Sequence, residues 1–365
     1  EGTLALGMLP PFVGFLRRAA GRSRLRLTLR GDWDAPAIAG SAEIEADSLR
    51  FSGFSQELQA VTGTVDFTPR RAQITRLRGK LGGGTFSGQG QLQLEAFVPS
   101  AFTLNLDLDR VRYSIQDGLW GVGTGALSIK GAPGRPVELA GEVRIHEGGY
   151  EEHIRLVSLS DGLFRKKVDR ARTYDLEREV VAFDLRLQIP ERFQVRYNLD
   201  LIDFRAEMRG ALRVTGTNER LGLLGEIEAI DGTVTYISKN FELRSARVAF
   251  VEEFSVHPRV DVLATLRETV DRGEERGGKT EYVIDLRVRA DGDARPEIML
   301  TSDPHEDERD IITLLHFGFT SRDVETLKGE DLVGLGGEIL FRSFKLDERL
   351  GKLFPFPPEV IQPKY

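Results

Sequence analysis

Apolar and polar residues alternate along most of this 365-residue chain. In residues 102–109, Phe and Leu occupy every second position, and Thr, Asn and Asp stand between them. The same period of two recurs at 183–189, 193–201 and 282–288. Successive side chains of a β-strand point to opposite faces of its sheet, so each segment has one apolar face and one polar face. The pattern predicts a mainly β protein with a long, curled, antiparallel-type sheet.

Asp-Gly pairs occur along the chain at 117–118, 161–162, 231–232 and 291–292. The glycine of such a pair adopts a positive φ readily, which is typical of the tight turn of a β-hairpin. We therefore expect a hairpin turn at each of the four positions.

A degenerate repeat is visible in three segments, 25–51, 126–150 and 211–236. Each contains a strand, a glycine, a polar turn, a second glycine and a second strand that ends near an aromatic residue. The paired glycines are Gly31 and Gly40, Gly131 and Gly141, and Gly216 and Gly225. Repetition of one local geometry predicts stacked strands that contact only their neighbours. Chance similarity among antiparallel hairpins is the alternative.

Four regions depart from the β pattern. Residues 160–180 are highly charged and predict a solvated excursion, and 270–280 predict a Gly-rich charged loop. A helix is expected from about Asp303 to Phe317, with Pro304 at its first position and acidic residues in its first turn. Gly318 ends this helix, and its predicted apolar side comprises Ile311, Ile312, Leu314, Leu315 and Phe317. A second helix is expected at about 331–350.

These elements suggest three regions: an elongated β region at 1–300, a helical cap or plug at 301–350, and a Pro-rich tail at 351–365. A stacked sheet leaves an open apolar end, and the first helix directly follows the last predicted strand. We therefore expect Ile311, Leu314 and Leu315 to lie against the sheet.

Composition argues against several classes of function. The net charge of −7 comes without a basic block, which excludes a nucleic-acid-binding surface of the usual kind, and the chain has no cysteine. None of the five histidines has the spacing of a zinc motif, and the Gly clusters lack phosphate-loop spacing. We expect no catalytic site, no metal site and no cofactor. The 21 Phe, against 7 Tyr and 2 Trp, suit hydrocarbon contact or core packing better than sugar binding.

Two stretches carry a family resemblance. Residues 296–304 (PEIMLTSDP), followed by 310–318 (DIITLLHFG), resemble the C-terminal signature of the TamB family, the inner-membrane subunit of the translocation and assembly module. Residues 225–236, leading to 241–250 and then to His257-Pro258, are also similar to that family. The resemblance covers most of 20–350, and its motifs are structural.

The resemblance implies a β-taco, a curled sheet around an apolar groove, in the periplasm of a diderm bacterium. It implies phospholipid acyl chains as cargo, support of outer-membrane protein assembly, and an Omp85-family outer-membrane barrel as partner. Because the chain begins at Glu1, we expect an anchor in the inner membrane to lie upstream of it. The family usually ends in strands with a terminal aromatic residue, so we expect the end at 358–365 to be truncated.

The alternation of apolar and polar residues then predicts which side chains face the groove. They are Phe102, Leu104, Leu106, Leu185, Leu187, Val195, Tyr197 and Leu199, whereas Thr103, Asn105, Asp107 and Arg186 should face water. The alternative function is a non-catalytic structural or adhesive β-solenoid with a dry core.

Overall fold

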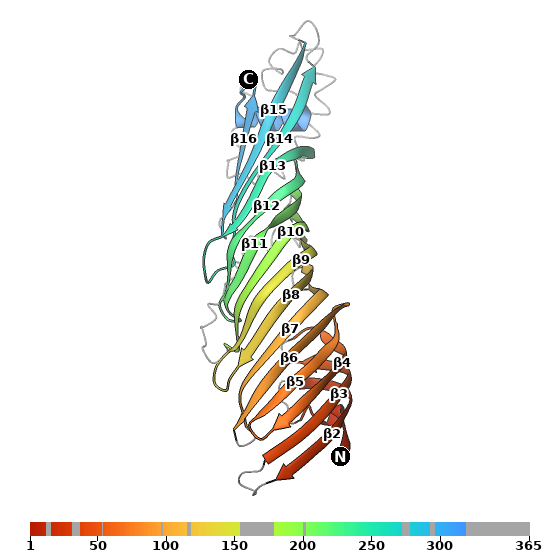
Figure 1. Cartoon of the computed structure of the whole chain (residues 1–365). Helices are drawn as coiled ribbons and strands as arrows, with labels where there is room; N and C mark the ends of the chain where they lie inside the picture. Colours follow the sequence, from red (N-terminus) through yellow and green to blue (C-terminus); the bar gives the residue numbers. More distant parts are fainter. Residues whose placement is uncertain are drawn as a thin grey trace. The chain divides into compact units, whose positions relative to one another are not determined.

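The computed structural model contains one sheet of 16 strands that follow one another in sequence order (Figure 1). It describes residues 1–11, 16–30, 37–52, 54–95, 98–114, 118–153, 179–199, 202–271, 278–292 and 296–318. The strands are β1 (Gly2–Ala5), β2 (Leu16–Arg30), β3 (Ala37–Phe51), β4 (Glu57–Thr68), β5 (Arg71–Leu81), β6 (Gly84–Glu95), β7 (Val98–Ser114), β8 (Leu119–Gly131), β9 (Val137–His153), β10 (Val181–Leu199), β11 (Ile202–Thr217), β12 (Leu221–Tyr236), β13 (Lys239–Phe250), β14 (Arg259–Asp271), β15 (Lys279–Asp291) and β16 (Glu297–Asp303). The prediction of a mainly β protein is confirmed.

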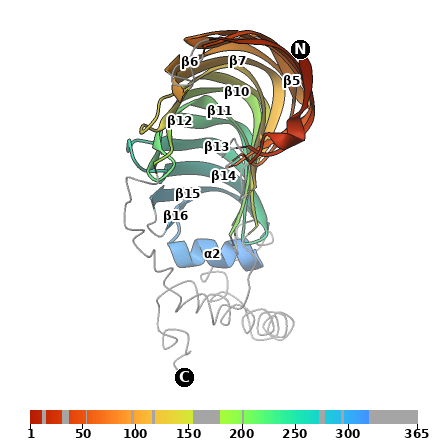
Figure 2. The ribbon, with the colours of Figure 1, turned by 90° about the horizontal axis from the view of Figure 1, so that it is seen from below.

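Contacts divide the chain into two compact units. The first comprises Glu1–Tyr236, Phe241–Ala264 and Arg287–Ile298, and the second comprises Ile237–Asn240, Thr265–Leu286 and Met299–Tyr365. Within the first unit each long strand bends into an arc (Figure 2).

One ladder of the first unit breaks the antiparallel pattern. Every ladder from β1 to β12 is antiparallel except that between β9 and β10, where Leu139 lies beside Phe183 and Val143 beside Leu187 in parallel register. Parallel neighbours require a connection that returns the chain to the other end of the strand. The charged segment 160–180 falls between these two strands, and its residues 160–178 lie outside the described part of the chain.

Arginine–carboxylate pairs join neighbouring strands on the polar side of the sheet. Arg22 of β2 lies 2.9 Å from Glu45 of β3, and Arg213 of β11 lies 2.8 Å from Asp184 of β10. Solvent screens such exposed pairs, so they contribute little, and apolar packing accounts for more of the stability.

The second glycine of each sequence repeat occupies an equivalent place in the fold. Gly40, Gly141 and Gly225 lie near the starts of β3, β9 and β12, with φ of 140°, 149° and 120°. At each of them a Cβ would clash with a carbonyl oxygen of the preceding strand. A residue with a side chain would be strained there, which explains why glycine recurs at this position.

The Asp-Gly prediction is wrong at one of its four positions. Asp231 and Gly232 lie inside β12, where Glu207 pairs with Asp231 and Met208 with Ala229, so that Ile230 is an extra, bulged residue. The Asp231 side chain accepts a hydrogen bond from the Gly232 amide at 2.7 Å, which stabilises the irregularity. Asp-Gly therefore marks a β-bulge here and not a turn. The pair at 161–162 and Asp117 of the pair at 117–118 lie outside the described residues.

The second unit contains a helix, α2 (Glu308–Phe317), which lies beside β16 in both ribbon views (Figures 1 and 2). It ends at Gly318 as predicted, but its start at Asp303 is wrong by five residues. Ser302 donates a hydrogen bond to the carbonyl of Pro304 at 2.8 Å and accepts one from the Glu306 amide at 3.1 Å. These bonds hold residues 302–306 in a turn that precedes the helix.

The predicted second helix at 331–350 and the tail at 351–365 lie outside the described residues. In the part of the chain that the structure does describe, no helix has the length and apolar character needed to span a membrane.

Candidate functional site

The strand register places apolar side chains of the first unit in rows that cross the sheet. Directly opposed residues of neighbouring strands lie on the same face, so a row can be followed from strand to strand. We call the face that carries these rows the apolar face, and the opposite one the polar face. The central row runs from β3 to β12 through Ile44, Gly63, Leu77, Gly88, Leu106, Leu127, Gly141, Leu185, Val214 and Leu223.

Large residues and glycines share each row. Gly88 lies between Leu77 and Leu106, and Gly141 lies between Leu127 and Leu185. A Cβ at Gly88 would lie 2.7 Å from Cδ2 of Leu106, so the leucine side chain occupies the space above the glycine. The alternation therefore gives the face a filled apolar surface at strand spacing.

Of the eight predicted groove residues, seven have described side chains, and all seven are half-buried. They are Phe102, Leu104, Leu106, Leu185, Leu187, Val195 and Tyr197; the side chain of Leu199 lies outside the described part. Of the residues expected to face water, Asn105, Asp107 and Arg186 are exposed and Thr103 is half-buried.

The structure brings these residues together in two groups. Leu106 and Leu185 belong to the central row, and the flanking row on one side joins Leu108, Gly125, Val143 and Leu187. Val195 and Tyr197 lie beyond a break in the register of β10 between Ile189 and Phe193. They therefore belong to a separate part of the apolar face.

Two fully buried clusters lie on the same face, and both were missed by the sequence analysis. One packs Leu6 of the 3-10 helix η1 (Leu6–Met8) with Leu16, Ala46, Val61 and Phe86. The other contains Ile189, Phe193, Ala206, Met208 and Ile227. Period two at 204–208 could have indicated Met208, but no local signal places η1 against strands that follow it in the sequence.

The apolar face and the polar face differ in their ionisable side chains. The central row carries no ionisable side chain, and the described residues contain no cluster of His, Asp or Glu suited to a metal ion. On the polar face, hydrogen bonding to Arg213 lowers the pKa of Asp184. That shift comes from an exposed ion pair between strands and indicates no reactive group.

The three predicted cap residues are buried in the second unit. Ile311, Leu314 and Leu315 of α2 are each 1 % exposed. The strand residues Tyr282, Ile284 and Leu286 of the same unit are 2 % exposed or less. Burial lowers the pKa of the half-buried His316, which therefore favours its neutral form within the helix.

Residues 75–354 match the family described as the TamB C-terminal domain. The match covers the strands from within β5 to β16 and the helix α2. No curated protein sequence matches the chain.

Proposed function

The chain belongs to the TamB family, a non-enzymatic family of the translocation and assembly module of the cell envelope, and from this premise we propose that its apolar face carries phospholipid acyl chains. The transport would run between the inner and outer membranes, through the periplasm. The observation that carries the proposal is the half-burial of Leu104, Leu106, Leu185 and Leu187.

A closed core and a lipid path differ in how far such side chains are buried. In a close-packed core, leucines of adjacent strands are removed from water almost completely. The rows of β7–β10 retain part of their exposure, whereas Phe86 and Met208 on the same face are buried at 6 % and 0 %. Partial exposure leaves apolar area that an acyl chain can cover, at a gain of about 0.8 kcal/mol per buried CH₂ group.

The length of the apolar surface supports movement rather than a single binding site. The central row crosses ten strands, β3 to β12, and strands are spaced about 4.8 Å apart, so the row extends on the order of 40 Å. Its members carry no charge from one end to the other. An acyl chain could therefore shift along the row without meeting a group that must be desolvated.

The same proposal implies partners for this protein in both membranes. We infer that an Omp85-family outer-membrane barrel receives the cargo or is assembled with the help of this protein. We further infer that the full-length protein is anchored in the inner membrane.

Site-specific photo-crosslinking tests the lipid path. A benzophenone side chain at Leu187, between Val143 and Leu212 on the apolar face, should capture phospholipid in cells, as identified by mass spectrometry. The matched control is Arg186, one residue earlier on the exposed polar face. Capture at position 186 as strong as that at 187 would contradict the proposal.

A structural or adhesive β-solenoid with a dry core is the second candidate. The buried clusters around Leu6 and Met208 favour it, since they close parts of the apolar face with protein side chains. Purified protein that carries no phospholipid, together with no capture at Leu187 or Leu106, would support this second function.

A further inference from the structure

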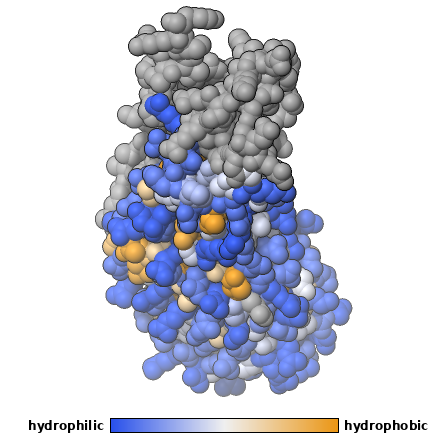
Figure 3. Space-filling view, turned by 90° about the horizontal axis from the view of Figure 1, so that it is seen from above, coloured by the Kyte–Doolittle hydropathy of each residue, from blue (hydrophilic) through white to orange (hydrophobic). Residues whose placement is uncertain are grey.

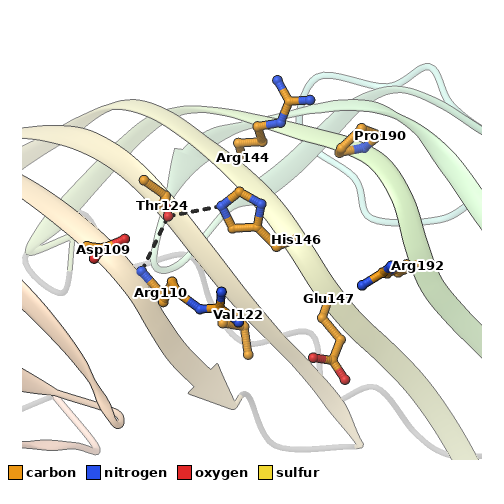
Figure 4. Close-up of a pocket in the computed structure, with 9 residues that line it drawn as sticks. All are labelled: Asp109, Arg110, Val122, Thr124, Arg144, His146, Glu147, Pro190 and Arg192. Carbon is orange, nitrogen blue, oxygen red and sulfur yellow. Dashed lines mark hydrogen bonds between the residues drawn. The ribbon is translucent and has the colours of Figure 1, made fainter.

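The polar face of the first unit contains a depression of about 450 Å³ (Figure 4). Its lining comes from four neighbouring strands: Asp109 and Arg110 of β7, Val122 and Thr124 of β8, Arg144, His146 and Glu147 of β9, and Pro190 and Arg192 of β10. The apolar rows described above lie on the other face of the same strands.

Bulges in three strands, which lie at similar positions along the strands, form this depression. In β7 the register shifts between Leu108 and Val111, and in β10 it shifts between Ile189 and Phe193. In β9 His146 is an extra residue, because Val122 pairs with Glu147 and Gly123 with Ile145. Each bulge adds a polar side chain to this face. Strand β8, which has no bulge here, lies between β7 and β9.

The hydroxyl of Thr124 links two of these bulges. It accepts a hydrogen bond from the amide of Arg110 at 3.3 Å, and it lies 3.0 Å from Nε2 of His146 (Figure 4). Arg110 and Arg192 have φ of 48° and 61°, a left-handed conformation that is unfavourable for a residue other than glycine. The sequence places arginine there although glycine would fit the backbone better.

Arginines outnumber carboxylates among the residues that line the depression. Three guanidinium groups, those of Arg110, Arg144 and Arg192, stand against the carboxylates of Asp109 and Glu147. Within the described part of the chain none of these three arginines forms an ion pair, whereas Arg209 on the same face lies 2.8 Å from Glu228. The lining residues therefore carry one more positive than negative charge and have unused guanidinium donors. The carboxylate of Glu207, which accepts a hydrogen bond from the Arg192 amide at 3.0 Å, lies next to them and offsets this difference in charge.

We propose that this depression binds a carboxylate side chain on an acidic segment of a partner protein. Guanidinium groups bind carboxylates through paired, charge-assisted hydrogen bonds, and the unpaired guanidinium groups of the lining have donors available for one carboxylate. Val122 gives the floor an apolar contact for the methylene groups of a glutamate. A lipid on the apolar rows could not reach this site with its headgroup, since the sheet separates the two, so the inference is independent of the proposed function.

Fluorescence anisotropy of a fluorescein-labelled oligo-glutamate peptide tests the proposal on the full chain at low salt. Arg192→Glu should weaken binding by roughly tenfold or more, and the milder Arg192→Gln should weaken it less. Arg196→Glu is the matched control: it makes the same change of charge on an exposed residue of β10 outside the depression, and it should leave binding nearly unchanged. Because the whole chain has a net charge of −7, general attraction of the peptide is weak.

Equal losses for Arg192→Glu and Arg196→Glu would overturn the proposal, because they would indicate a diffuse charge effect. Absence of peptide binding by the unaltered chain would overturn it too. Binding to phosphatidylglycerol vesicles that is lost in Arg192→Glu, without peptide binding, would assign the site to a lipid headgroup instead. Lipid capture at Leu187 should persist in every Arg192 variant, which separates failure of this proposal from failure of the lipid path.

Discussion

The hydroxyl of Tyr282 donates a hydrogen bond to Oε1 of Glu306 at 3.0 Å, and the two residues are only 2 % and 8 % exposed. Tyr282 belongs to β15, and Glu306 lies in the turn that precedes α2. The bond therefore joins the strand to the start of the helix inside the second unit. Without such a partner a buried carboxyl group would be costly.

Tyr282→Phe should destabilise the second unit by about 1–3 kcal/mol, because it removes this donor while Glu306 stays buried. Hydrogen exchange of the α2 amides is a suitable measurement, since local opening of the helix would speed their exchange. Glu306→Gln keeps an acceptor for Tyr282 and removes the buried charge, so its effect should be smaller. A larger effect of Glu306→Gln would contradict this account of the bond.

Leu315→Ala should cost roughly 2–5 kcal/mol, since the side chain is 1 % exposed and its loss leaves a cavity. Urea unfolding of the purified chain measures this cost. The control is Glu308→Ala, an exposed first-turn position of the same helix, which should cost about 1 kcal/mol or less. Equal stability of Leu315→Ala and the unaltered chain would argue against α2 as a cap on its unit.

Gly88→Ala should destabilise the first unit by about 1–3 kcal/mol, because the new Cβ would clash with the backbone oxygen of Asn105 and crowd Leu106. Gly63→Ala provides a control in the same row, since its Cβ would lie 3.4 Å from Leu77, an ordinary contact distance. Thermal unfolding should separate the two variants. Similar losses in both would mean that the row tolerates no side chain at either glycine.

The ion pair of Asp261 and Arg287 predicts sensitivity to acid. Hydrogen bonding to Arg287, at 3.0 and 2.7 Å, lowers the pKa of Asp261 below its ordinary value of 3.8. A lowered folded-state pKa contributes stability that is present above 3.8 and lost as the pH falls through the lowered value. Arg287→Gln should therefore reduce stability at neutral pH and flatten the loss below pH 3.8, as seen in unfolding curves across that range. Arg289→Gln, whose guanidinium lies 3.8 Å from Asp261, should change the profile less.

Period-two alternation was sufficient to predict the sheet, because a strand with one apolar face must show it in the sequence. It also assigned Leu106 and Leu185 to one face, since a register error of one residue would have exposed both. Alternation says nothing about the direction of the neighbouring strand, so the parallel step between β9 and β10 could not be seen.

Other features depend on contacts that are remote in the sequence. The depression around Thr124 needs bulges in β7, β9 and β10 to lie at one level, and each bulge alone resembles ordinary strand sequence. The start of α2 was misjudged because Pro304 suits the first turn of a helix as well as it suits the turn at 302–306. Local signals of this kind identify candidate boundaries, and the surrounding structure selects among them.

The parallel step between β9 and β10 bears on how such a sheet can change length during evolution. Gain or loss of a whole hairpin adds or removes two strands, and it leaves the direction of every other strand unchanged. A stack that grew only in this way would have all its odd-numbered strands running in one direction. Strand β10 runs in the same direction as β9, so the count is offset by one from this point onward. Gain or loss of whole hairpins on either side of this step would leave the parallel pairing of β9 and β10 in place.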